Sequence, residues 1–374
     1  MKVENVFTSN QKKRYMVVAD DGNPIEPVLQ FLKFRDNTGA ARNTLRAYSY
    51  HLKLYFEFLD QCNLNYLTVN IDDIANFLGW LQMPDSNLKV SYIGMQESNR
   101  SIGSVNIIVN TVMIFYEYLV RHEHYTSDIP DKFKKWMAYS KRGYKDFLYH
   151  INKDRMFKAN FIKLKAPKLK PKILTKDQVQ LLVQSCINKR DIFLIRLLWE
   201  SSMRIGEALG LWIEDFDICA TKIYIKDRGE LENGSEIKTI HSPRAIDVSA
   251  ELMNEFMDYI AELHTDEVDT NFVFIKLTGP NKFRPLEYQD VVSLFNRLKK
   301  KTGIDANPHM LRHTSLTELR RAGWEAEHLR LRAGHKHFQT TMQMYIHPSD
   351  EDLRTDWEKS KEKMLLKPDM KGNV

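Results

Sequence analysis

One strongly basic tract divides this chain and limits how it can fold. Between Asp131 and Lys172 there are 14 lysines and arginines but only three acidic residues, a net charge of +11. The remainder carries −5, because the whole 374-residue chain has a net charge of +6. So many charges cannot lie in an apolar core. We therefore expect a separately folded part on each side of the tract, and the chain is long enough for two cores.

The same tract indicates a partner. Its basic residues are interleaved with aromatic ones, a composition that suits contact with a phosphate backbone, where counterion release drives binding. Its end, Ala166–Pro171, has two prolines flanked by lysines, which is typical of an extended tether. A solvated linker without DNA contacts is the alternative interpretation. The candidate backbone contacts near this end are Lys163, Lys165, Lys168 and Lys170.

Before the tract, apolar residues follow a helical period. Asn43-Thr44 marks a helix start, and apolar residues then recur at intervals of one to four as far as Leu59. Two further apolar segments cover residues 71–81 and 105–119. Spacings of three and four keep one face of a helix apolar. This part of the chain therefore predicts a small all-helical domain.

After the tract, the pattern is mixed. Thr175–Gln178 is a capping-box sequence that opens a helix, and a second apolar helix is expected over residues 191–199. Between residues 221 and 248 the period changes to two, and Gly229 and Asn233-Gly234 supply turns, which predicts a short antiparallel sheet. The pattern is helical again afterwards. The fold class is therefore mainly α with a small antiparallel β-sheet.

These patterns set the expected domain boundaries. They are an N-terminal tail, a helical domain, a basic linker, a mixed α/β domain and a C-terminal helix or tail, at residues 1–27, 28–125, 126–172, 173–350 and 351–374. No segment approaches the roughly 18 uncharged apolar residues that a membrane span needs. The first residues do not resemble a signal peptide. We therefore expect a cytoplasmic protein with no membrane contact.

The cysteines exclude two kinds of site. Cys62, Cys186 and Cys219 lie far apart and form no CxxC pair, which argues against a disulfide framework and a structural zinc site. We expect buried thiols in a reducing compartment.

Four short segments of the second part carry candidate chemistry. Two arginines, two histidines and a tyrosine stand in them in a fixed order: Arg204 in Met203–Leu209, His309 and Arg312 in Pro308–Thr314, His335 after Ala333-Gly334, and Tyr345 ten residues later. Two guanidiniums can hold the oxygens of a phosphodiester with permanently charged donors. The histidines can donate hydrogen bonds and move protons. A tyrosine has a pKa of about 10, so it needs a base or a positive field to attack.

This set resembles the tyrosine recombinase (phage integrase) family, whose pattern is Arg, Lys, His-x-x-Arg, His or Trp, and Tyr. The resemblance covers about residues 40–350, and the layout is most similar to transposase A proteins of Gram-positive site-specific transposons. It implies a helical core-binding domain and a mixed α/β catalytic domain that close around DNA as a C-shaped clamp. It also implies that Tyr345 attacks the scissile phosphate, forms a 3′-phosphotyrosyl link and releases a 5′-hydroxyl.

The family's proton donor to that hydroxyl is a lysine in a β-hairpin. Lys238 matches the family's Lys-Thr-x-x-Ser-x-Arg form, and Lys226 is the competing candidate. His309 is the candidate base. His313 is expected to be a structural, hydrogen-bonded histidine that points off the face carrying His309 and Arg312. Glu207 either orients the Arg204 guanidinium or is an ordinary surface acid.

The resemblance also implies partners. We expect double-stranded DNA, a homotetramer on DNA that passes through a Holliday junction, accessory recombination proteins, and association with the nucleoid when DNA is bound. The C-terminal segment, residues 351–374, is expected to dock in a neighbouring protomer or, alternatively, to fold back on its own domain. Neither a metal nor ATP nor another cofactor is expected, because the phosphotyrosine keeps the bond energy. Integration or excision of a mobile element is the favoured role. The alternatives are resolution of dimers, DNA relaxation like that of a type IB topoisomerase, and a catalytically dead DNA-binding protein.

Overall fold

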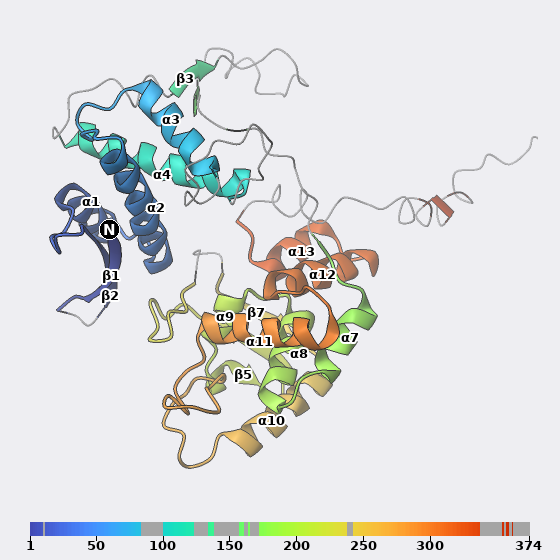
Figure 1. The fold of residues 1–374 in the computed structure, drawn as a ribbon. Coiled ribbons are helices and arrows are strands. Elements are labelled where there is room, and N and C mark those ends of the chain that lie inside the picture. The colour runs from blue at the N-terminus through green and yellow to red at the C-terminus, as the bar shows by residue number, and fades with distance from the viewer. Residues whose placement is uncertain are drawn as a thin grey trace, which may run out of the picture. The chain divides into compact units, whose positions relative to one another are not determined.

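The computed structural model describes residues 1–9, 12–83, 100–122, 134–137, 157–160, 164, 172–237 and 242–336, with residues 354, 357, 358 and 361. The chain forms two compact units, Met1–Lys168 and Leu169–Val374 (Figure 1). The N-terminal unit contains β1 (Lys2–Phe7), β2 (Lys13–Val18), α1 (Glu26–Asn37), α2 (Arg42–Gln61), α3 (Ile71–Gln82), α4 (Ile102–Arg121), β3 (Lys134–Met137) and β4 (Phe157–Asn160). The C-terminal unit contains α7 (Lys176–Gln184), α8 (Lys189–Ser201), α9 (Ile205–Leu209), a 3₁₀ turn (Ile213–Asp215), β5 (Phe216–Asp217), β6 (Lys222–Ile225), β7 (Arg244–Asp247), α10 (Ala250–Leu263), α11 (Tyr288–Thr302), α12 (Pro308–Arg321) and α13 (Ala326–Ala333). The predicted fold class, mainly helical with small antiparallel sheets, is confirmed.

Three helices predicted from apolar spacing form the core of the N-terminal unit. They are α2, α3 and α4, and each buries its apolar stripe. Asn70 caps α3 by accepting from the backbone N–H groups of Asp72 and Asp73, and Ser101 caps α4. Tyr55 and Tyr116, both fully buried, share a 2.6 Å hydrogen bond between their hydroxyls. The core is therefore apolar, with its few buried hydroxyls paired.

The predicted N-terminal tail is wrong. Residues 2–18 contain two antiparallel strands, β1 and β2, and β2 packs against α2. Tyr15 is 8% exposed and Val17 is 1% exposed, so both belong to the core of the unit. The sequence did not reveal this because two isolated strands gain stability only from the helix that they cover.

The basic tract also contains paired strands. β3 and β4 run antiparallel, with Lys134 opposite Asn160 and Met137 opposite Phe157. The predicted linker, residues 126–172, therefore holds a β-ladder that composition did not indicate. Lys163, Lys165, Lys168 and Lys170 lie outside the described residues.

α4 has the length and composition of a membrane span, contrary to the expectation that no segment approaches one. However, 56% of its most apolar window is buried inside its own unit. Core helices of globular proteins share these properties, so a single candidate of this kind is weak support for a membrane span.

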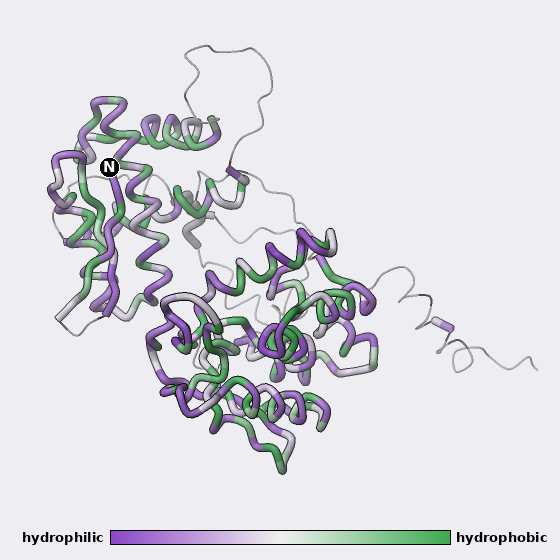
Figure 2. The backbone as a smooth tube through the Cα atoms, turned by 60° about the horizontal axis from the view of Figure 1, so that its bottom comes forward, coloured by the Kyte–Doolittle hydropathy of each residue, from purple (hydrophilic) through white to green (hydrophobic). Residues whose placement is uncertain are grey.

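The C-terminal unit is built around α8. Phe193, Leu194, Leu197 and Leu198 of this helix are at most 1% exposed. The Phe193 ring lies within 6.1 Å of four other aromatic rings, those of Phe216, Phe256, Tyr259 and Phe274. Hydrophilic and hydrophobic residues alternate along the helices (Figure 2), as expected where each helix buries one face.

The predicted antiparallel sheet is confirmed. Its order is β5-β6-β7, and Ile223 pairs with Ile246. Gly229 and Gly234 have φ values of 68° and 75°, which a glycine adopts without strain. The capping box at Thr175 is also present, because its hydroxyl accepts from Gln178 N and the Gln178 side chain accepts from Thr175 N.

The prediction of buried thiols is wrong for two of the three cysteines. Cys62 and Cys219 are exposed, and only Cys186 is half-buried. Cys62 is the C-cap residue that follows α2, and Cys219 lies in the turn between β5 and β6. Turns and helix ends face solvent, which residue type alone did not indicate.

Candidate active site

The C-terminal end of α13 organises three arginines. Helix ends leave carbonyls without intrahelical partners, and these carry partial negative charge. Three consecutive carbonyls each accept from a different arginine: Arg332 O from Arg244 Nε at 2.7 Å, Ala333 O from Arg312 Nη2 at 2.6 Å, and Gly334 O from Arg204 Nη2 at 3.2 Å. Gly334 has a φ of 64°, the left-handed conformation that ends many helices. Residues up to 130 positions apart therefore meet at one helix end.

A second helix end holds Arg312 from the other side. Ser202 ends α8 with a φ of 57°, a conformation that a non-glycine residue seldom adopts. Its carbonyl accepts from Arg312 Nη1 at 2.6 Å, and its hydroxyl lies 2.6 Å from that of Ser315 on α12. These contacts compensate for the strained backbone, and they fix a guanidinium that is only 1% exposed.

One buried carboxylate joins two of these arginines. Glu207, 4% exposed, accepts from the backbone N–H of Arg204 at 2.8 Å and from Arg204 Nη1 at 2.9 Å. It also accepts from Arg244 Nη1 at 3.2 Å and Nη2 at 2.9 Å. Burial by itself raises the pKa of Glu207, but the hydrogen bonds and charge of Arg244, and then the charge of Arg312, bring that pKa below its ordinary value. Glu207 therefore orients Arg204, and it is not a surface acid.

His335 follows the same helix end and is buried among the arginines. Arg312 Nη2 lies 3.0 Å from His335 Nε2. A guanidinium can only donate, so Nε2 accepts and the neutral ring carries its proton on Nδ1. Burial, followed by the positive charges of Arg312 and Arg204, lowers the pKa of His335 to about 3. With a neutral His335, the guanidiniums of Arg204, Arg244 and Arg312 face the carboxylate of Glu207, so these described residues together carry an excess of positive charge.

His309 is exposed in the first turn of α12, which Asn307 caps by accepting from Met310 N at 3.0 Å. The expectation that His313 points off the face carrying His309 is wrong, because the two rings lie 4.1 Å apart. Positions i and i+4 are neighbours on a helix surface, which explains this contact. Burial, His309 and Arg312 lower the pKa of His313 to about 4.

The depressed histidine pKa values predict a pH-dependent stability. Unfolded histidines have a pKa of about 6.5, so below this pH the unfolded state binds protons that His335 and His313 in the folded state do not. We expect the free energy of unfolding to be highest above pH 6.5. Below pH 6.5 it should decrease by up to about 1.4 kcal/mol per pH unit for each histidine. The measurement is the urea-unfolding free energy at several pH values between 7.5 and 5.

In that measurement, His335→Asn and His313→Asn should each make the pH dependence shallower. His328→Asn, at an exposed position of α13, is the matched control and should leave it as in the parent protein. An unchanged pH dependence in both buried-site variants would show that the pKa of each histidine is the same in the folded and unfolded states, contrary to the prediction.

Lys226, the competing candidate for the proton donor, forms an ion pair with Asp215. Its Nζ lies 3.0 Å from Asp215 Oδ1, and Asp215 is fully buried. Arg228 donates to both oxygens of the same carboxylate, at 2.9 Å and 2.7 Å, and stacks over the Trp212 ring at 4.2 Å. Lys226 is therefore part of an ion cluster that fastens the end of β6.

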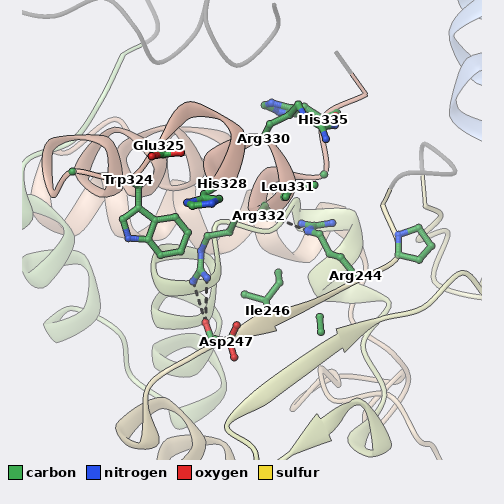
Figure 3. Close-up of a pocket in the computed structure, with 14 residues that line it drawn as sticks. Arg244, Ile246, Asp247, Trp324, Glu325, His328, Arg330, Leu331, Arg332 and His335 are labelled. Atoms are coloured by element: carbon green, nitrogen blue, oxygen red, sulfur yellow. Dashed lines mark hydrogen bonds between the residues drawn. The ribbon is translucent and has the colours of Figure 1, made fainter. Parts of the chain in front are cut away.

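A cleft of about 840 Å³ lies beside the arginine cluster, between β7 and α13. Arg244 and His335 are among the residues that line it (Figure 3). Arg332 donates from Nη1 and Nη2 to Asp247 O, both at 3.2 Å, and its guanidinium lies 5.3 Å from the Trp324 ring. Because this cleft adjoins Arg244 and His335, the space beside the arginine cluster is larger than a single phosphate needs.

The structure thus brings together Arg204, Arg312 and His335 of the predicted set. Lys238, Tyr345 and the predicted C-terminal segment, apart from four of its residues, lie outside the described residues. Arg244 was missed as a site residue, although it is the final arginine of the Lys-Thr-x-x-Ser-x-Arg form. Among the described residues, no group of three or more His, Cys, Asp or Glu side chains has the arrangement of a metal site.

Comparison with known proteins finds similar sequences over most of this chain. Residues 172–352 match the Phage integrase family. Transposase A from transposon Tn554 of Staphylococcus aureus is 37% identical over 360 residues, which cover 96% of this chain and 98% of that protein. Tyrosine recombinase XerA of Pyrococcus horikoshii is 25% identical over 332 residues, covering 89% and 92%.

Two solved structures share the fold. The Tn1549 transposon integrase in complex with transposon right end DNA has a TM-score of 0.58 and 19% identity, covering 89% of this chain and 98% of that one. The XerH site-specific recombinase bound to its difH substrate has a TM-score of 0.55 and 17% identity, covering 88% and 82%. Identities this low show likeness of fold alone.

Proposed function

This chain belongs to the phage integrase family of tyrosine recombinases, and from that membership we propose that it cleaves and rejoins DNA through a phosphotyrosine bond to Tyr345. One observation carries the proposal. Three consecutive carbonyls at the end of α13 gather three arginines around a neutral His335. Excess positive charge in a mostly buried, prearranged site suits a phosphate that gains charge in its transition state.

Arg204 and Arg312 are the proposed phosphate ligands. Arg204 has the more accessible side chain of the two arginines that bind Glu207, at 23% exposed. Arg312 is fixed by two helix ends, so its charge lies at a constant position. Guanidiniums held in advance need no reorganisation when charge develops on the non-bridging oxygens. His335 supports the same oxygens through its Nδ1–H.

The proposed reaction conserves the bond energy of DNA. The phenol oxygen of Tyr345 attacks phosphorus as His309 accepts the phenol proton, and a 3′-phosphotyrosyl bond forms. The bond from phosphorus to the 5′ oxygen breaks, and Lys238 gives that oxygen a proton. A 5′-hydroxyl from a second DNA strand then attacks the phosphotyrosine and reverses the steps on a new partner.

We further propose that the substrate is double-stranded DNA at the ends of a mobile element. The 37% identity to a transposase over nearly the whole chain supports this role more than it supports dimer resolution. Four copies would each cut one strand, with a Holliday junction as the intermediate between the two pairs of cuts. We place the protein in the cytoplasm, on the nucleoid when DNA is bound, together with accessory recombination proteins.

The test is covalent capture. A duplex that spans one end of the element, nicked a few nucleotides downstream of the cleavage position, lets the short 5′-hydroxyl strand diffuse away. A protein–DNA adduct resistant to denaturation and attached at a 3′ phosphate is then expected to accumulate. Adducts on every supercoiled plasmid, with relaxation and without strand exchange, would instead indicate topoisomerase activity.

The lysines of the basic tract are proposed backbone contacts. Replacing Lys163, Lys165, Lys168 and Lys170 by glutamine should lower the slope of log affinity against log salt by up to about 3.6, since each phosphate contact contributes about 0.9. Fluorescence anisotropy over a series of salt concentrations measures it. A slope equal to that of the parent protein would show that these lysines form only a solvated linker.

A further inference from the structure

We propose that Arg244 is a positioning residue of this reaction, which orients Arg204 and His335 without binding the phosphate itself. The inference rests on the proposed function, because it assigns a task to a residue beside the proposed phosphate ligands. Arg244 is the first residue of β7, and its side chain is 10% exposed. Its position is fixed by elements far apart in the sequence.

The donors of Arg244 are almost fully used. Nε donates to Arg332 O at 2.7 Å, and Nη1 donates to Ser242 O at 2.7 Å and Glu207 Oε1 at 3.2 Å. Nη2 donates to Glu207 Oε2 at 2.9 Å. A guanidinium has five N–H donors, so these four bonds leave little capacity for a ligand. Arg204, by contrast, makes two such side-chain bonds among the described residues.

One route of action runs through Glu207. This carboxylate accepts two bonds from Arg244 and two from Arg204, one of them from the Arg204 backbone. Arg244 is also the first of the charged groups that lower the pKa of Glu207. Without Arg244, the bonds from Arg204 are the ones that the buried carboxylate would keep among the described residues, and it would draw that guanidinium toward itself. Arg244 therefore holds the carboxylate so that the Arg204 side chain stays directed at the ligand.

The other route runs through the end of α13. Arg244 donates to Arg332 O, and Arg332 in return donates to Asp247 O from both Nη1 and Nη2. β7 and α13 are thus joined at both ends of the strand, along the cleft of Figure 3. The next two carbonyls of α13 hold Arg312 and Arg204, and the next residue is His335. Fixing the Arg332 carbonyl fixes the residues that follow it.

The test separates positioning from general stability by changing the charge of the substrate. A methylphosphonate at the cleavage position replaces one anionic oxygen by a neutral methyl group, so the phosphate needs less positive charge. We expect Arg244→Met to slow cleavage of the ordinary phosphate by about 100-fold, the cost of misplacing a site group by about 1 Å. On the methylphosphonate, the loss relative to the parent protein should shrink to less than about 10-fold, as it should for Arg204→Ala.

Arg228→Met is the matched control. Arg228 also makes a two-pronged bond to a buried carboxylate in the same unit, and its side chain is 13% exposed, but its partner is Asp215. Any decrease in the cleavage rate of this variant, relative to the parent protein, should be the same on the phosphate and on the methylphosphonate. If Arg244→Met lacks a stable fold by thermal melting, Arg244→Lys, which keeps the charge but loses the fork of donors, is measured instead.

Two results would overturn the inference. One is a loss in the Arg244 variant that is equal on both substrates, as in Arg228→Met, and the other is cleavage of the phosphate at the parental rate. A different result would overturn the proposed function itself: no covalent adduct between the parent protein and the ordinary phosphate substrate. The two failures are therefore distinguishable in one set of measurements.

Discussion

Replacing Tyr345 by phenylalanine is expected to abolish covalent capture of DNA, with a loss of at least about 10⁴-fold in cleavage rate, while DNA affinity stays within about twofold. The change removes one oxygen and keeps the ring, so the side chain keeps its size and shape. Without the phenol oxygen, phosphorus has no protein nucleophile, although the arginine cluster can still bind the phosphate. Denaturing electrophoresis of the nicked substrate after incubation measures the adduct.

Tyr288→Phe is the control for that experiment. Tyr288 begins α11 and is 55% exposed, so this change also removes one hydroxyl from a tyrosine of the catalytic unit. It should form the adduct at the parental rate. An adduct that persists in Tyr345→Phe would refute the assignment of the nucleophile, even if the protein remains a recombinase.

Lys238→Ala should slow cleavage by about 10²–10⁴-fold, the usual contribution of a general acid. The reason is that an alkoxide leaves poorly unless it is protonated. Lys226→Ala should change the rate by less than about threefold, because Lys226 is paired with the buried Asp215. Single-turnover cleavage of the nicked duplex measures both variants.

A substrate with sulfur in place of the bridging 5′ oxygen identifies the acid directly. A thiolate leaves without a proton, so this substrate should restore cleavage by Lys238→Ala to within about tenfold of the parental rate. It should give no selective relief to Arg204→Ala, whose defect concerns the non-bridging oxygens. If Lys226→Ala, and not Lys238→Ala, is the variant that the sulfur restores, the two lysines exchange roles.

Much of the fold could be predicted from local patterns. The apolar stripes of α2, α3 and α4, the capping box of α7 and the period of two in β6 are each encoded within a few turns or a single strand. The N-terminal strands could not be predicted in this way. Their burial depends on α2, which begins 24 residues after β2 ends, and a local pattern holds no information about such a partner.

For the candidate site, too, residue types could be predicted from the sequence and their arrangement in space could not. The types and order of Arg204, His309, Arg312, His335 and Tyr345 carried the resemblance to the family, and phosphate chemistry explains why these residue types are needed. How the charges are arranged could not be predicted. The part of the chain that the structure describes gives no test of the roles of Lys238 and Tyr345, which stay predictions, as does the clamp around DNA.

The sequence by itself determined the chemical groups, which depend on residue identity, and its ordered motifs carried the resemblance to the family. Only the tertiary structure decided that Arg244 and Glu207 belong with the site, that His335 is neutral, and that His313 lies against His309. The physical reason is that backbone carbonyls hold the arginine side chains in place. Ser202 O and the three carbonyls that end α13 orient the arginines, and every residue type carries the same carbonyl, so only the fold determines which ones meet.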